Sequence, residues 1–305
     1  MAFEYDLAKF IPFRDLVACE RVRRIKRADI CRHKNPDFKI RVVDDATEFY
    51  GAFAADIAAR IDRARQEGRK FVGIFPVGPM PQYPIAAAII NRLRVTCHHV
   101  HSFNMDEYAD QDGKTAPDDW PGSFQKAMME KFWLAIDADL RPPAGQIHFP
   151  TADSLPRYQE MIEKTGGADV CYGGIGWCGH IAFWEAHLGD EFGDDLEAYK
   201  KAGPRLVELH PMTIMQNALH SFGGDWSWVP PKANTLGPAQ ILGARHRSFW
   251  LDGDLGGGVS WQKFIARLVA HGPVNTYVPG SILQTAPTDY TLLGGVADDV
   301  QINMA

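Results

Sequence analysis

The stretch 173–185, GGIGWCGHIAFWE, combines a run of glycines with His180 and Glu185. Glycine lets the backbone turn sharply and approach a ligand closely. Histidine titrates near neutral pH, and a carboxylate five residues further on is close enough to orient its ring. The segment therefore indicates a site of proton transfer. A glycine-rich turn with a structural histidine is the alternative reading.

The stretch 103–108, FNMDEY, places two adjacent carboxylates, Asp106 and Glu107, at the end of an expected strand. Removal from water at such a strand end raises the pKa of a carboxyl group into the range useful for a general base. An aspartate that caps the next element is the alternative for this segment taken alone.

The chain around these segments alternates between strand and helix patterns. Residues 70–77 form a continuous apolar run, which is typical of a strand buried on both faces of a parallel sheet. Further strands are expected at 39–43, 99–104, 146–149 and 168–175, around 249, and at 290–293. Helices are expected after residue 45, where apolar residues recur at i, i+4 spacing, and at 84–93, 123–136, 154–164 and 261–270.

This alternation predicts an α/β fold, a modified Rossmann-like, doubly wound and mostly parallel sheet with helices on both faces. Ligands of such sheets bind beyond the carboxyl ends of the strands, so segments 77–81, 103–108 and 173–185 are expected to converge on one crevice. Residues 1–38 carry many arginines and lysines and are expected to form a helical N-terminal extension. Residues 39–305 are expected to form a single α/β catalytic domain. The extension packs on this domain or on another subunit, so a homo-oligomer is possible.

The composition excludes several classes of partner. A net charge of −6 gives no reason to expect nucleic acid, and no apolar run is long enough to span a membrane. The N-terminus does not resemble a secretory signal. The 5 cysteines are odd in number and form no C-x-x-C pair, which indicates reduced thiols and a cytoplasmic protein.

The FNMDEY segment followed by G-x-G-x-x-G-H-I-A-F-x-E resembles the glucosamine-6-phosphate deaminase/isomerase family, which shares a broad fold group with the 6-phosphogluconolactonases. The resemblance implies a modified Rossmann-like fold. It also implies that Asp106 moves a proton between C1 and C2 of an open-chain sugar, that His180 opens the sugar ring, and that Glu185 supports His180. No metal or organic cofactor is expected, and the sequence shows no cluster at metal-ligand spacing.

The sequence departs from the family at three places. Cys178 stands where the family has an acid just before the Gly-His pair. Residues 78–81, Gly-Pro-Met-Pro, replace a G-G-[ST]-P loop that holds the phosphate, so two N–H donors and a hydroxyl are lost. Ile214, after Thr213, occupies the expected place of an arginine. These changes predict an altered sugar, either unphosphorylated or with an acid or other group in place of phosphate.

Substrate-binding roles are expected for a set of residues near the crevice. Lys263 is the candidate replacement for the family's phosphate lysine, with a solvated helix lysine as the alternative. Tryptophans near the crevice are candidates for stacking on a sugar ring, or else pack in the core. The expected binding set is Gly78, Met80, Glu107, Gly174, Cys178, Gly179, Thr213 and Lys263, and the tryptophans are Trp177, Trp184, Trp226 and Trp228.

The sequence thus predicts an aldose–ketose isomerase or amino-sugar deaminase whose partner is a small sugar or sugar phosphate. One alternative is a lactonase-like hydrolase in which His180 activates water. The carboxylate Asp106 argues against it, because a lactonase needs no base at C2. The other alternative is a non-catalytic sugar-binding regulator, which would not need to keep Asp106, His180 and Glu185 together.

Overall fold

A seven-stranded parallel sheet forms the centre of the computed structural model, which describes residues 5–302 and 304. Every neighbouring pair in this sheet runs parallel. The expected doubly wound α/β architecture is therefore confirmed. In spatial order the strands are β1 (Phe38–Val43), β10 (Thr288–Leu293), β9 (His246–Leu251), β6 (Val170–Gly173), β2 (Phe71–Phe75), β3 (Val100–Asn104) and β5 (Ile147–His148).

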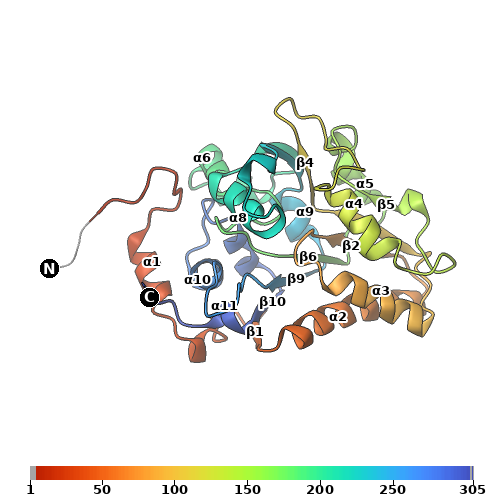
Figure 1. Ribbon diagram of the computed structural model, residues 1–305, viewed down its shortest axis with the longest axis horizontal. Coiled ribbons are helices and arrows are strands. Elements are labelled where there is room, and N and C mark those ends of the chain that lie inside the picture. The colour runs from red at the N-terminus through yellow and green to blue at the C-terminus, as the bar shows by residue number, and fades with distance from the viewer. Residues whose placement is uncertain (1–4, 303, 305) are drawn as a thin grey trace.

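Helices cover the sheet, with α2 and α3 packed side by side on one side of it and α8 on the other in the view of Figure 1. The side chain of Asp45 caps the first turn of α2, whose apolar stripe is buried, as the i, i+4 spacing predicts. The helices are α1 (Leu16–Arg23), α2 (Ala46–Gln66), α3 (Gln82–Leu93), α4 (Phe124–Met128), α5 (Tyr158–Lys164), α6 (Gly189–Phe192), α7 (Leu196–Lys200), α8 (Pro211–Ser221), α9 (Pro238–Gly243), α10 (Lys263–His271) and α11 (Gly294–Ala297).

A second, antiparallel sheet was not predicted. Its strands are β4 (Asp106–Ala109), β8 (Lys232–Thr235) and β7 (Arg205–Glu208). One residue, Met105, separates β3 from β4, so the chain leaves the central sheet at Asp106. Asp106 therefore lies at the junction between the central sheet and the antiparallel sheet.

The N-terminal extension packs on α10, at the left of Figure 1. Backbone oxygens of the extension accept hydrogen bonds from α10, as when Arg267 donates from Nε to the carbonyl of Ile25 at 2.9 Å. Val22 of α1 and Ile30 are buried. The guanidinium of Arg27 forms ion pairs with Asp44 and Asp298. Part of the basic cluster is therefore used in contacts within the chain.

The search for membrane-spanning segments gives a negative result. Among residues 5–302 and 304, no helix has both the length and the apolar character needed to cross a bilayer.

Candidate active site

A cavity of about 440 Å³ lies beyond the carboxyl ends of β2, β3 and β6. Its wall includes the loop 77–81 after β2, Asp106 after β3 and residues 174–176 after β6, together with His180. The three segments expected to converge therefore line one cavity. This is the position at which open parallel sheets bind their ligands.

The carboxyl group of Asp106 is 6 % exposed and lines the cavity. Burial raises its pKa to about 8, since the ionised form is removed from water; Glu107 and Glu185 act in the same direction, whereas His180 opposes them. A carboxyl group with this pKa exchanges protons near neutral pH. It is therefore suited to carry a proton between two positions of a ligand.

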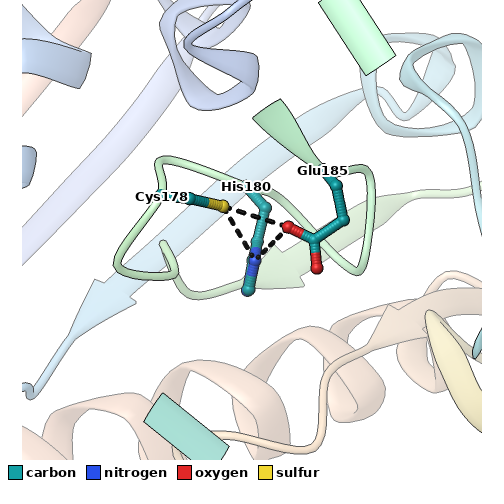
Figure 2. A group of neighbouring side chains, drawn as sticks. All are labelled: Cys178, His180 and Glu185. Carbon is teal, nitrogen blue, oxygen red and sulfur yellow. Dashed lines mark hydrogen bonds and ion pairs between the residues drawn. The ribbon is translucent and has the colours of Figure 1, made fainter. Parts of the chain in front are cut away.

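His180 lines the cavity, and buried residues behind it hold its ring through the nitrogen Nδ1 (Figure 2). Its Nδ1 lies 3.2 Å from Oε2 of Glu185 and 2.9 Å from Oγ1 of Thr213. The thiol of Cys178 and the hydroxyl of Thr213 donate to the same Glu185 oxygen, at 3.0 and 2.9 Å. Since Nδ1 is taken by this buried group, Nε2 is the nitrogen that His180 offers to the cavity.

The electrostatics of this group favour a charged histidine. Burial opposes the imidazolium, but Glu185 and Cys178 together outweigh it and raise the pKa of His180 well above its usual value. Burial would also raise the pKa of Glu185, yet His180 lowers it. The two residues therefore form a buried ion pair. Burial and the Glu185 charge raise the pKa of the Cys178 thiol, which stays a neutral donor.

Cys178, His180 and Glu185 also correct one expectation, that no cluster has metal-ligand spacing. Their donor atoms all lie within 4.8 Å of one another, so the three residues could hold a metal ion. The same atoms are joined by hydrogen bonds to each other and to Thr213. The bonds to Glu185 involve its Oε2, whereas its Oε1 is buried and has no hydrogen-bond partner among the described residues.

Glycine is required beside the histidine ring. A Cβ atom at Gly176 would lie 2.0 Å from Nε2 of His180, so no other residue fits there without displacing the ring. Gly179 has a φ of +88°, in the left-handed region that other residues avoid. The glycine run is thus explained by the close packing of this loop around His180.

The expected substrate-binding residues separate into two groups. Gly78, Met80 and Gly174 line the cavity. Glu107 does not, because its carboxylate accepts hydrogen bonds from the backbone at Tyr108, Phe124 and Gln125 and from the hydroxyl of Ser123. It therefore fixes the start of α4, a structural role that corrects the expectation for Glu107.

Four further residues that were expected to bind the substrate do not line the cavity. Cys178 and Thr213 lie behind His180, where they hold its ring instead of lining the cavity. Gly179 also lies outside the cavity wall, and its carbonyl accepts from the N–H of Gly280 at 2.8 Å. The ammonium of Lys263 donates to the carbonyl of Gly258 at 2.7 Å, and its side chain lines a different cavity.

The tryptophans proposed for stacking are not gathered in the cavity. Trp184 is buried against Phe192 and Tyr199, as in the core-packing alternative. Trp226 and Trp228 are each 63 % exposed and lie outside the cavity wall. Trp177 lies beside Trp261, with ring centroids 6.2 Å apart, and it is Trp261 that lines the cavity.

Sequence reasoning missed several residues of the cavity wall. One polar face of α8 contributes pairs at i, i+4 spacing, and Asp252 directly follows β9 with its carboxylate accepting from Tyr50 at 2.8 Å. Both could have been found, since Asp252 follows a strand end and the α8 residues share a helix face. The missed wall residues are Tyr50, Tyr108, Gln216, Asn217, His220, Ser221, Trp250, Asp252, Trp261 and Gln262.

The fold and this site define a class of α/β proteins with a ligand site beyond the carboxyl ends of a parallel sheet. A solved monomeric glucosamine-6-phosphate deaminase is 21% identical, with a TM-score of 0.71 over 85% of this chain and 99% of that chain. A 6-phosphogluconolactonase from Thermotoga maritima is 14% identical, with a TM-score of 0.58 over 83% of this chain and 98% of that chain. At such identities the likeness shows the fold.

Sequence relatives narrow the class to a family, although no family model matches the chain. A glucosamine-6-phosphate deaminase from Caenorhabditis elegans is 32% identical over 213 residues, 67% of this chain and 72% of the relative. One from Beutenbergia cavernae is 30% identical over 254 residues, 82% of this chain and 87% of the relative. The chain belongs to the glucosamine-6-phosphate deaminase family.

Proposed function

We propose that the protein converts an open-chain 2-amino aldose into the corresponding ketose and ammonia, by proton transfer between C2 and C1. The observation that supports this most directly is that Asp106 and His180 line one cavity, with Asp106 nearly buried and at a pKa of about 8. The family relationship supports it independently, because the curated relatives are glucosamine-6-phosphate deaminases.

In this proposal His180 acts first. Its Nε2 donates a proton to the ring oxygen of the closed sugar while the C1 hydroxyl loses its own, and the ring opens. Glu185 keeps the imidazolium charged and Thr213 fixes the ring through Nδ1. Because Nδ1 is held, the proton that His180 transfers is the one on Nε2.

Asp106 acts next. Its carboxylate takes the proton from C2 of the open aldose and returns it to C1, while the aldehyde oxygen gains a proton and the amino nitrogen loses one, so that the 2-amino aldose becomes the imine of the ketose. Water then adds to the imine and ammonia leaves, so that one aldose and one water give one ketose and one ammonia. A substrate with a hydroxyl at C2 would follow the same proton transfer and stop at the ketose.

We also propose that residues 39–305 are a single catalytic domain and that residues 1–38 are an extension of it. The contacts of Arg267 and His271 in α10 with the backbone at Ile25 and Ile30 support this division. The extension then stabilises α10 through these contacts.

Deuterium exchange tests the proposed function. The protein is incubated in D₂O with glucosamine, glucosamine 6-phosphate, glucose and fructose 6-phosphate, and the C2 and C1 protons are followed by NMR while ammonia is measured enzymatically. We expect C2 exchange and ammonia release with at least one amino sugar. Asp106→Asn should lower both by about 1000-fold, as loss of a general base does, whereas Asp118→Asn, at an exposed aspartate, should leave them unchanged.

Two results would contradict the proposal. Exchange that persists in Asp106→Asn would show that another group moves the C2 proton. Hydrolysis of a sugar lactone without any C2 exchange would instead favour the lactonase alternative.

A further inference from the structure

The charges of the cavity wall indicate whether the end of the substrate that does not react can be an anion. Among the described residues, the wall contains the carboxylates Asp106 and Asp252 and the imidazoles His180 and His220, but no lysine or arginine. Burial lowers the pKa of His220, so this residue is neutral at pH 7. Apart from His180, the described part of the wall therefore offers no cationic side chain to an anion.

The loop after β2 offers few donors for an anion. In segment 76–84 the positions Pro76, Pro79, Pro81 and Pro84 have no backbone N–H. The N–H of Tyr83 donates to the carbonyl of Met80 at 3.2 Å. Anion sites at the start of a helix need free N–H groups that point to the ligand, so the start of α3 is a poor phosphate site.

The start of α10 is also a poor site for a phosphate. Gln262, and not Lys263, faces the cavity. Its amide is already used, because Nε2 donates to the carbonyl of Ile175 at 2.6 Å and Oε1 accepts from the N–H of Gly253 at 2.7 Å. This end of the cavity therefore has a neutral, fixed side chain where a cation would be needed for an anionic substrate.

Neutral polar groups are available instead. Nδ2 of Asn217 and Nε1 of Trp261 are buried donors that find no hydrogen-bond partner among the described residues, and both side chains line the cavity. The Asp252 carboxylate takes one hydrogen bond from Tyr50 and has lone pairs left for others. Such donors and acceptors match sugar hydroxyls. Burial raises the pKa of Asp252, and in either protonation state this group gives an anion no cationic partner.

We infer that the end of the substrate remote from C1 and C2 is an uncharged, hydroxyl-bearing group, bound by Asp252, Asn217 and Trp261, and that the protein acts on unphosphorylated amino sugars. This inference rests on the proposed function and specifies its substrate class. It also excludes a carboxylate in place of the phosphate, since a carboxylate would lack a cationic partner in the same way.

The test compares glucosamine with glucosamine 6-phosphate in two assays. The first is kcat/KM for C2 exchange, where we expect the unphosphorylated sugar to be preferred by about 100-fold, because an unpaired buried charge is strongly disfavoured. The second is a titration followed by tryptophan fluorescence, since Trp250 and Trp261 line the cavity. Here inorganic phosphate should show no binding below about 1 mM.

Two variants test whether Asp252 or Lys263 determines the preference between glucosamine and glucosamine 6-phosphate. Asp252→Asn removes the charge but keeps the shape, so it should reduce the preference against glucosamine 6-phosphate by about 10-fold. Lys263→Met is the matched control and should leave the preference unchanged, because Lys263 lies outside the cavity.

The outcomes distinguish this inference from the proposed function. A preference for glucosamine 6-phosphate, or phosphate binding tighter than about 1 mM that is lost in Lys263→Met, would overturn the inference and leave the deaminase proposal intact. If no sugar exchanges its C2 proton, the proposed function fails for this panel. The fluorescence titration with inorganic phosphate then still decides whether the cavity accepts an anion.

Discussion

The thiol of Cys178 lies 3.0 Å from Oε2 of Glu185, the same oxygen that pairs with the imidazole of His180. A residue that the family resemblance presents as acidic is here a neutral donor to the remaining carboxylate. The buried cluster thus contains one negative and one positive charge, and Glu185, with a smaller contribution from Cys178, stabilises the charged His180.

Glu185→Gln should therefore lower the pKa of His180 below its usual value, because burial then acts without an opposing carboxylate. We expect the free energy of unfolding at pH 6 to fall by about 3 kcal/mol, as when one partner of a buried ion pair is removed. C2 exchange should also fall. NMR titration of the His180 ring and urea unfolding measure these effects. Glu208→Gln, at an exposed glutamate, is the control; an unchanged His180 pKa in Glu185→Gln would contradict the ion pair.

Thiol reactivity should distinguish the cysteines. Cys31 is exposed, and the other four are buried. Burial raises the pKa of Cys97, Cys171 and Cys178, which further slows their reaction, because the thiolate is the nucleophile. Ellman's reagent should therefore label one thiol rapidly in the native protein, and Cys31→Ser should remove this phase. Rapid labelling of a second thiol together with loss of activity would show that Cys178 is accessible.

The sequence was sufficient for the parts of the site that lie in short segments after strands. Asp106 and the glycine loop around His180 could be located because each follows a segment that the alternating pattern predicts as a strand. The start of α10 was misjudged, since adjacent helical residues point about 100° apart and the sequence alone does not show which one faces the cavity. Gln262 faces it and Lys263 does not.

Long-range contacts account for the other failures. Tyr50 and Asp252 are joined by a hydrogen bond across 202 positions of the sequence, which no local pattern reveals. The antiparallel sheet of β4, β8 and β7 consists of 4-residue strands that are too short to show a clear alternation. Glu107 is predicted to bind the substrate as the second of two adjacent carboxylates at a strand end, although successive residues of a strand point to opposite faces.

Gly176→Ala should inactivate the protein, because the added Cβ would lie 2.0 Å from Nε2 of His180. We expect displacement of the ring and a loss of C2 exchange of about 100-fold, as for a misplaced catalytic group. Gly51→Ala is the control, since a Cβ there meets nothing within 4 Å and Gly51 lies inside α2. That variant should keep activity and gain about 1 kcal/mol of stability. Full activity in Gly176→Ala would contradict the position of His180.

Activity and stability should change in opposite directions with pH. Asp106 must be ionised to take the C2 proton, and burial raises its pKa to about 8, so C2 exchange should rise as the pH passes through 8. The unfolded chain releases the same proton near the ordinary aspartate pKa of 3.8. Between these values the folded state binds more protons than the unfolded state, so the free energy of unfolding falls as the pH rises.

His180 adds to the same trend. Its folded pKa is raised, so its contribution to stability is complete below the ordinary histidine pKa of 6.5 and is lost as the pH rises through the folded pKa. In Asp106→Asn the part of this decline due to Asp106 should disappear, and the variant should be more stable than the wild type at pH 8 by a few kcal/mol. Urea unfolding from pH 5 to pH 9 measures both curves. A wild-type protein whose stability rises over this range would show that Asp106 is ionised at neutral pH and that its burial is offset by contacts with donors.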